Sequence, residues 1–471
     1  MAAENQSWKN KQIMARCFRK LMPGLSLNLI ALVVPCSVAQ VSAENLVEAL
    51  ANVYQNDPTL NAERARQRGS DEAVAQALSG WRPTVSATGT FTKSWSDSSA
   101  SAVASLTSSN LSIELSQPIF RGFRTINSTK SAEADVAAGK QKLLAVEQEV
   151  LLRAVQAYMN VLRDKEIFGL RQSGLKAFRR QSQDVGLRFK AGDVTKTDVA
   201  QTQARLAGAL ADVATAKATL AASMANYEKT IGHRPQKLSY PVDIKLPWSL
   251  EVSQSMAQTS NPNVLSATYV QNSATYRTEV AKGNLWPEIS LSASASDAVN
   301  PQQGVDRSTN FQVGGILSFP LYDGGKTYSK IREAKQLESQ RSLDIILQAR
   351  SVREGVANAW YRMAAAQESL VAVTSLVRAN ELALNGVRKE YVAGTRSTLD
   401  ALNAENELIT SKIKFISAKH DITVSSFLLL HAIGVLTAQD IHLPVEVYDA
   451  DRNYLAVRGK WFGTGANLKN D

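Results

Sequence analysis

The sequence is poor in the residues on which most enzymes and disulfide-bonded proteins depend. Among 471 residues there are two cysteines, four histidines and only 7 % aromatic residues. Both cysteines, Cys17 and Cys36, lie in an N-terminal segment that we expect to be cleaved, so the mature chain would have no disulfide and no thiolate ligand or nucleophile. His420 and His431 would lie about 16 Å apart along a helix, too far to share a metal. No His-Glu-x-x-His or Gly-x-Ser-x-Gly motif occurs, so the sequence predicts no enzyme, no metal and no cofactor.

Concentrated positive charge is also lacking. The formal net charge is +10, but five basic residues fall within the first twenty positions: Lys9, Lys11, Arg16, Arg19 and Lys20. No later element carries the clustered lysines and arginines that a nucleic-acid-binding surface needs. We therefore expect no nucleic-acid partner.

The N-terminal apolar run, Leu25–Val34, is shorter than the ~20 residues that a transmembrane helix needs. It follows the basic stretch Arg16–Lys20 and precedes small residues that end at Ala43. This order is typical of a secretory signal peptide over residues 1–43.

Two points about this segment stay open. Translation from Met14 would give a signal peptide of more ordinary length, which N-terminal sequencing of the precursor would test. Lipidation at Cys36 is an alternative, although the preceding Val33-Val34-Pro35 departs from the usual small-residue pattern.

What the sequence does contain is an internal repeat of domain size. Pro118-Ile119-Phe120-Arg121-Gly122 recurs as Pro320-Leu321-Tyr322-Asp323-Gly324, 202 positions later. The same offset relates further pairs, and upstream it is 204: Tyr158 and Trp360, Gly192 and Gly394, Asp198 and Asp400, Ile231-Gly232 and Ile433-Gly434, then Pro58 and Pro262, Pro83 and Pro287. A period of about 200 residues is too long for a solenoid repeat and indicates a duplicated unit.

The two copies predict the same order of elements: a helix, two strands, a very long helix, a tight glycine turn and a second helix. The boundaries are residues 44–232 for unit one, with strands about 84–96 and 106–119, and residues 251–434 for unit two, with strands about 288–297 and 308–320. The sequence therefore predicts a mixed α and β protein with internal duplication.

The helices of unit one are expected to be unusually long. Residues 123–190 contain no proline, so they can form one helix of roughly 100 Å. Helices 44–80 and 195–231 together have a similar length, and we expect them to stack end to end along it. The non-repeated residues 233–250 and 435–471 are expected to wrap the helices near their middle.

Helix 195–231 carries two parallel seams. An apolar seam and an alanine seam run side by side: Val199, Leu206, Leu210, Val213, Leu220, Met224, Tyr227 and Ile231, then Ala207, Ala211, Ala214, Ala218, Ala221 and Ala225. One seam would indicate a coiled-coil pair, whereas two adjacent seams indicate a neighbour on each side. Helices of this kind form a sheet or closed cylinder, and a long helical bundle is the alternative that seams alone leave open.

The strands favour the first alternative. Within 84–95, Val85, Phe91 and Trp95 share one face while the other face has only serine and threonine. Soluble sheets also alternate, but strands of about 10 residues with a hydroxyl-rich face are typical of an outer-membrane barrel, apolar outside and polar inside. Four strands cannot close such a barrel, and open edges in lipid would leave backbone groups unsatisfied. The barrel must therefore be shared between copies; three copies would supply twelve strands, although this argument does not determine the number.

Together these features resemble the TolC-type outer-membrane efflux proteins. The resemblance covers nearly all of the mature chain and rests on five kinds of element: the Glu44-Asn45-Leu46 start, the Arg82-Pro83 and Trp286-Pro287 strand entries, the two Pro-x-aromatic-x-Gly exits, the two glycine tips and the duplication. It implies a homotrimer with a twelve-stranded β-barrel in the outer membrane of a Gram-negative bacterium and a twelve-helix α-barrel in the periplasm.

The resemblance also implies a function. Such a trimer is a passive exit duct that contacts outer-membrane lipid and docks to a periplasmic adaptor and an inner-membrane transporter of the RND, ABC or MFS class. Its cargo would be drugs, detergents or other small toxic compounds. A dedicated duct for type I protein secretion is the alternative, and a trimeric structural or adhesin coiled coil is a remote one.

A gate at the periplasmic tips is carried over from the family by motif. Arg396 would pair with Asp198 and Thr197, and Tyr391 would hydrogen-bond Asp198. Only unit two has a guanidinium and a phenol at these positions. Ordinary helix turns with solvated polar residues are the alternative.

Further tip positions complete this prediction. Asp400 would line the constriction as an acidic ring, and Asn403 stands where the family often has a second acid, so we expect three charges per trimer and weak cation binding. A cation at this ring is an alternative that stays open. The exposed tip turns are expected to contact the adaptor: Ala191, Gly192, Asp193, Ala393, Gly394 and Thr395.

One motif looks like a nucleotide-binding loop. Phe319–Lys330 reads FPLYDGGKTYSK and lies between a predicted strand and a predicted helix, as a P-loop does. A P-loop needs a glycine five positions before Gly325, where Pro320 stands, and unit one has no Gly-Lys pair. We therefore interpret Gly324 and Gly325, like Gly122 in unit one, as joints between a membrane strand and a periplasmic helix.

Overall fold

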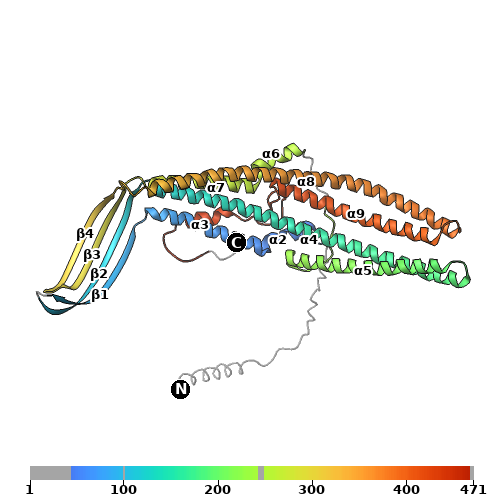
Figure 1. The fold of residues 1–471 in the computed structure, drawn as a ribbon, viewed down its shortest axis with the longest axis horizontal. Coiled ribbons are helices and arrows are strands. Elements are labelled where there is room, and N and C mark those ends of the chain that lie inside the picture. The colour runs from blue at the N-terminus through green and yellow to red at the C-terminus, as the bar shows by residue number, and fades with distance from the viewer. Residues whose placement is uncertain (1–43, 99–100, 242–248, 467–471) are drawn as a thin grey trace, which may run out of the picture. The chain divides into compact units, whose positions relative to one another are not determined.

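A computed structural model describes residues 44–98, 101–241 and 249–466 (Figure 1). The expected signal peptide with Cys17 and Cys36 lies outside these residues, as do 242–248 of the inter-repeat segment and 467–471 of the tail. The elements follow in the order α2 (Leu46–Asn56), α3 (Pro58–Leu78), η1 (Ser79–Trp81), β1 (Thr84–Ser98), β2 (Ser101–Arg121), α4 (Arg124–Ala191), α5 (Lys196–Ile231), α6 (Leu250–Ser260), α7 (Pro262–Gly283), β3 (Glu288–Gln302), β4 (Val305–Ser318), α8 (Lys326–Val392), α9 (Thr398–Ile433) and α10 (Ala450–Arg458).

The described chain is mixed α and β and mostly helical, as expected. Its two halves present the same order: two short helices, a strand pair, a helix of 68 or 67 residues and a helix of 36 residues. None of the described helices combines the length and the apolar character needed to cross a membrane.

The single helix expected over 44–80 is wrong, because the chain breaks into α2 and α3 at Asp57. Pro58 has no backbone N–H and so favours the first position of a new helix. The Asp57 carboxylate caps that helix by accepting from the backbone N of Thr59 at 2.8 Å and of Leu60 at 3.0 Å. Asn261 and Pro262 divide α6 from α7 in the same way.

The four strands form one antiparallel sheet in the order β1-β2-β3-β4. They have 15, 21, 15 and 14 residues, each longer than the range predicted for it. The apolar face is open, with Phe91 75 % and Phe311 73 % exposed. The register shifts between Pro118 and Phe120 where β2 pairs with β3, since a proline cannot donate to the ladder. β1 and β4 are the two edges of the sheet.

The long helices pack side by side in a layer (Figure 1). α4 contacts α2, α3, α5, α7 and α9, with α3 and α5 on one side of it and α7 and α9 on the other (Figure 1). α8 packs on α6, α7 and α9. The chain therefore has two lateral sides, one formed by α3, α5 and β1 and the other by α8 and β4.

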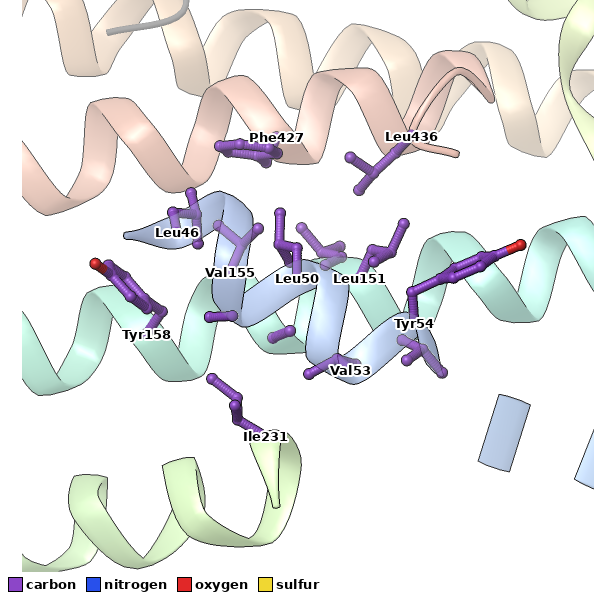
Figure 2. Close-up of a cluster of buried hydrophobic side chains, with 14 of the residues drawn as sticks. Leu46, Leu50, Val53, Tyr54, Leu151, Val155, Tyr158, Ile231, Phe427 and Leu436 are labelled. Carbon is purple, nitrogen blue, oxygen red and sulfur yellow. The ribbon is translucent and has the colours of Figure 1, made fainter. Parts of the chain in front are cut away.

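The largest buried cluster lies where α2 crosses the middle of α4 (Figure 2). Leu50 of α2 and Leu151 of α4 are 2 % and 0 % exposed, and Leu436 of the C-terminal segment packs with them. The buried Tyr158 Oη lies 2.8 Å from the Glu44 carbonyl oxygen and 2.6 Å from that of Ser239. This hydroxyl thereby joins the start of the described chain to the inter-repeat segment. The two segments also form a parallel bridge through Glu44 and Leu238.

Candidate functional site

The two helical hairpins end in matching turns. Gly192 follows α4 with φ +83°, and Gly394 lies between α8 and α9 with φ +79°. Any residue with a Cβ is strained in this region, so both turns favour glycine. The six turn residues predicted to contact an adaptor are all exposed.

A capping box follows each turn and holds a predicted site carboxylate. Asp198 Oδ2 accepts from the backbone N of Thr195 at 2.9 Å and from its Oγ1 at 2.7 Å. Asp400 Oδ2 accepts from the backbone N of Ser397 at 3.1 Å and from its Oγ at 2.8 Å. These hydroxyl and backbone donors lower the pKa of both carboxyl groups. Both residues are therefore ionised at neutral pH and stabilise the start of α5 or α9.

Arg396 contacts its own hairpin. Its Nε donates to Glu390 Oε2 at 2.8 Å, and within the described chain it forms no pair with Asp198 or Thr197. Thr197 is exposed. The predicted Arg396 pairs are therefore not formed within one chain, and pairing between the tips of neighbouring copies stays a prediction.

Tyr391 bridges two long helices instead of bonding Asp198. Its Oη accepts from Arg188 Nη1 at 2.8 Å and from Gln181 Nε2 at 3.3 Å. The Arg188 guanidinium carbon also lies 5.3 Å from the centroid of the Tyr391 ring. Sequence reasoning missed Arg188 and Glu390, which occupy equivalent positions of the two units with opposite charge. That charge inversion is the signal that could have found them.

The constriction residues lie at the start of α9. Asn403 Oδ1 accepts from Arg205 Nη2 of α5 at 2.9 Å, so the two hairpins are joined here. Leu402 is 2 % exposed and packs with Phe178 beneath the tips. Arg205 was not anticipated, and it places a positive charge beside the position expected to be neutral. In the described parts of the chain, no group of three or more His, Cys, Asp or Glu is placed to hold a metal.

The joint between β2 and α4 is tightly packed. Gly122 has φ +56°, and a Cβ there would lie 2.3 Å from the Gly283 carbonyl oxygen and 2.8 Å from Trp286 Cβ. Phe123 also has a positive φ of 60°, and its ring meets that of Trp286 edge to face, with centroids 6.1 Å apart. The entry to β3 therefore fills the space around this glycine.

Two arginines clamp the same joint. Arg121 Nε donates to Glu288 Oε1 at 2.9 Å, and Arg124 Nη2 donates to Glu288 Oε2 at 2.6 Å. Arg124 Nη1 also donates to Asn284 Oδ1 at 3.1 Å. One carboxylate at the start of β3 thus holds both ends of the β2–α4 turn.

The joint between β4 and α8 has the same backbone but no such neighbour. Gly324 and Gly325 have φ of +69° and +85°, and a Cβ on either would meet nothing within 4 Å in the described chain. Asp323 stands at the position equivalent to Arg121, and its Oδ2 accepts from the backbone N of Thr327 at 2.8 Å. This joint therefore caps α8 but faces open space.

Both lateral sides have open stretches. Every residue of the α5 alanine seam is exposed. α8 exposes large apolar side chains on the other side: Leu337, Leu343, Ile346, Leu347, Tyr361, Val371 and Leu382. The outer edges of β1 and β4 pair with no other described strand. The surfaces expected to need a second neighbour therefore have none within one chain.

Sequence comparison places these features among known proteins. The family model described as "Outer membrane efflux protein" matches residues 49–233 and 254–435, one match per half. The chain is 36 % identical over 424 residues to the outer membrane efflux protein BepC of Brucella suis, covering 89 % of this chain and 92 % of that one. It is 27 % identical over 412 residues to the outer membrane protein TolC of Vibrio cholerae, covering 85 % and 93 %.

A further relative is the alkaline protease secretion protein AprF of Pseudomonas aeruginosa, 25 % identical over 340 residues with 70 % of each chain covered. Among solved structures, the Campylobacter jejuni CmeC outer membrane channel superposes with a TM-score of 0.77 at 14 % identity, covering 88 % of this chain and 89 % of that one. The outer-membrane channel OprN gives 0.71 at 19 % identity, covering 83 % and 89 %. These structures share the fold of this chain.

Proposed function

The chain belongs to the outer membrane efflux protein family, and from that membership we propose that three copies form a passive exit duct, gated at its periplasmic tip. The duct would combine a twelve-stranded barrel in the outer membrane with twelve helices in the periplasm. An adaptor and an inner-membrane pump would dock at the tip turns and open it. Its cargo would be drugs, detergents or other small toxic compounds.

The observation that carries this proposal is the pair of open lateral sides. Edge strands β1 and β4 present unpaired backbone groups, which are tolerated in a membrane only when another strand covers them. One side offers small alanines on α5, whereas the other offers large apolar residues on α8. Because the two sides differ and are complementary, copies would associate head to tail and close into a ring.

The repeat predicts the register of that closure. Shifting the β1–β2 pair Ala87 and Ile113 by 204 and 202 positions gives Leu291 and Gly315, which do pair in β3–β4. The same shifts can be applied to the β2–β3 pairs, moving β2 forward to β4 and β3 back to β1. Ile113 and Ala295 then give Gly315 of one copy opposite Phe91 of the next.

This register satisfies two independent requirements. It keeps the apolar face continuous, because Leu317 would lie opposite Gly89 and Phe311 opposite Trp95 of the next copy. It also places Leu317 over Gly89 and Phe91 over Gly315, an arrangement in which large side chains cover glycines of the apolar face. A slip of two residues would set Gly315 against Gly89 and lose that cover.

The gate is proposed to act as a switch between closed and open tips. A single exposed ion pair is worth only about 0–1 kcal/mol. Three symmetry-related copies with their hydrogen bonds would bias closure by a few kcal/mol, which a partner that prefers the open state can overcome. Arg396 and Asp198 would be the residues that link neighbouring tips in the closed state.

Single-channel conductance in planar bilayers tests the gate. Arg396→Ala and Asp198→Ala should each raise conductance, whereas Arg234→Ala, which removes an exposed ion pair with Glu228 away from the tips, should leave it unchanged. Unchanged conductance in both tip variants would remove the gate assignment.

Export is tested by deleting the gene. We expect increased sensitivity to antibiotics and detergents, restored by the intact chain. Type I protein secretion is the second candidate, because AprF is named as a secretion protein for alkaline protease. Loss of secreted proteins without any change in drug sensitivity would favour that candidate.

A further inference from the structure

The C-terminal segment runs along α3 and α4 and is held there by several polar contacts. Asn453 Nδ2 donates to Asp71 Oδ2 of α3 at 2.7 Å. Arg458 Nη2 donates to Glu133 Oε1 of α4 at 2.7 Å, and Tyr454 packs on the buried cluster around Val74. These contacts therefore hold α10 against α3 and α4.

Beyond α10 the chain reaches the start of the sheet. Arg82, two residues before β1, donates from Nη1 to the Lys460 carbonyl oxygen at 2.8 Å. Its guanidinium carbon lies 4.8 Å from the centroid of the Trp461 ring, a cation–π contact. Lys460 Nζ donates to the Gly465 carbonyl oxygen at 2.9 Å and closes a small loop around the two aromatic residues that follow.

The tip of this loop is apolar and unprotected. Trp461 is 58 % exposed and Phe462 86 % exposed, and their ring centroids lie 6.4 Å apart. The hydrogen bond and the cation–π contact of Arg82 place the loop beside the start of β1 with both rings exposed. Exposing two large rings to water is unfavourable, so an adjacent pair of exposed rings indicates a surface that another phase or molecule covers.

We propose that this C-terminal loop is a lipid anchor: Trp461 and Phe462 enter the periplasmic leaflet of the outer membrane at the base of the barrel. The proposal rests on the proposed function for the location of the strands in the membrane. Phospholipid is the partner that the chemistry fits, because tryptophan beside basic side chains is typical of the membrane–water interface. Lys460, Arg458 and Arg82 would then face the phosphate groups.

The neighbourhood of the loop agrees with this assignment. Other exposed aromatic residues gather where the strands meet the helices, namely Trp81, Trp286, Phe319 and Tyr322. Outer-membrane barrels carry such a girdle at each interface. The C-terminal loop would extend this girdle beyond the strands, with residues that the repeat does not supply, because nothing in unit one corresponds to residues 460–466.

A spin label on a single cysteine tests the proposal. Phe462→Cys, labelled in the mature chain and reconstituted into phosphatidylethanolamine–phosphatidylglycerol vesicles, should collide more with oxygen, which concentrates in lipid, than with a water-soluble nickel chelate. Phe311→Cys on the apolar face of the sheet is the matched lipid control. Val447→Cys, 46 % exposed in the C-terminal segment before α10, is the aqueous control.

The outcomes separate the partners. Oxygen preference at position 462, at a shallower depth than at 311, supports the anchor. Preference for the nickel chelate overturns it, and so does protection from both reagents, which would instead place the loop against a neighbouring copy. If the label at position 311 also collides more with the nickel chelate, the membrane barrel of the proposed function is contradicted as well. If the label at 311 collides more with oxygen and the label at 462 does not, only the anchor is contradicted.

Discussion

The two long helices have equivalent places in the repeat but different surroundings. Twenty-five residues of α4 are buried, against six of α8. Within the described chain α4 contacts five helices, α2, α3, α5, α7 and α9, whereas α8 contacts three, α6, α7 and α9. A repeated sequence has thus produced one internal and one external helix, and the difference indicates where a second copy would complete the structure.

The strand-to-helix joints repeat this difference at a smaller scale. Gly122 is enclosed by the entry to β3, and Glu288 clamps both arginines beside it. Gly324 has the same left-handed backbone with open space around it. On the repeat, the residues that would fill this space are those at the entry to β1 of the next copy.

Truncation of a leucine should have the largest difference in effect between the two long helices, α4 and α8. Leu151→Ala in α4 removes a fully buried side chain and should cost about 2–5 kcal/mol of folding free energy. Leu347 in α8 is 67 % exposed, so Leu347→Ala should change the folding free energy of the chain by about 0.5 kcal/mol or less. The same substitution should weaken the association between copies. Urea denaturation in detergent and the proportion of heat-modifiable trimer measure the two effects. Equal losses in both assays would contradict the comparison.

Substitution by alanine should have different effects on stability at Gly122 and at Gly324. Gly122→Ala should destabilise the fold by about 1–2 kcal/mol because of the left-handed backbone. Overlap of the new Cβ with the Gly283 carbonyl should cost about 1–3 kcal/mol more. Within one chain, Gly324→Ala should be destabilised only by the backbone strain, because a Cβ on Gly324 meets no described atom within 4 Å. Thermal unfolding of the two variants as dissociated chains checks this, and a Gly324→Ala chain as unstable as the Gly122→Ala chain would contradict the difference between the joints.

The hydroxyl of Tyr158 should matter less than these packing changes. Tyr158→Phe removes the group that joins the Glu44 and Ser239 carbonyls, leaving these part-buried oxygens with one partner fewer. We expect a loss of about 1–3 kcal/mol in stability by urea denaturation. Tyr361→Phe, at a 59 % exposed position of α8, is the control and should be neutral.

Acidification should affect the two tips alike, and only weakly. Hydrogen bonds from Thr195 and Ser397 lower the pKa of Asp198 and Asp400 in the folded chain. Their stabilisation is therefore present above the unfolded pKa of about 4 and is lost as pH falls through the lower folded pKa. Hydrogen-exchange protection factors in the first turns of α5 and α9 should fall below that pH. Thr195→Ala removes one of the two donors to the Asp198 carboxylate and should weaken the pH dependence at α5 while leaving it at α9.

Periodicity in the sequence predicts much of this fold. Alternation of apolar and hydroxyl residues locates all four strands, and the proline-free stretch after Gly122 predicts α4. The break at Asp57 was missed because a helical pattern continues across it, and only the Asp-Pro pair marks the new start. The two hairpin connections are shorter than predicted: β1 and β2 extend to Ser98 and from Ser101, and β3 and β4 to Gln302 and from Val305. The serine-rich residues 96–110 give no clear turn signal at the first of these connections.

Contacts at the tips are less predictable from sequence. The structure gives Arg396 and Tyr391 partners on long, flexible side chains, Glu390 and Arg188, and the choice among nearby charges depends on rotamers. Pairing between copies depends further on surfaces that one chain does not contain. The motif therefore locates the tip region, while the pairs within it stay a prediction.

Disulfide trapping tests the closure of the duct most directly. A mature chain with Phe91→Cys and Gly315→Cys should form covalent dimers and trimers on oxidation, because the repeat places these positions opposite each other in neighbouring copies at the spacing a disulfide needs. Phe91→Cys with Gly314→Cys is the matched control, since residue 314 points to the other face of the sheet and should not cross-link. Covalent trimers from the 315 pair alone are the predicted result. No intermolecular cross-link, or equal cross-linking by both pairs, would contradict the shared barrel in this register.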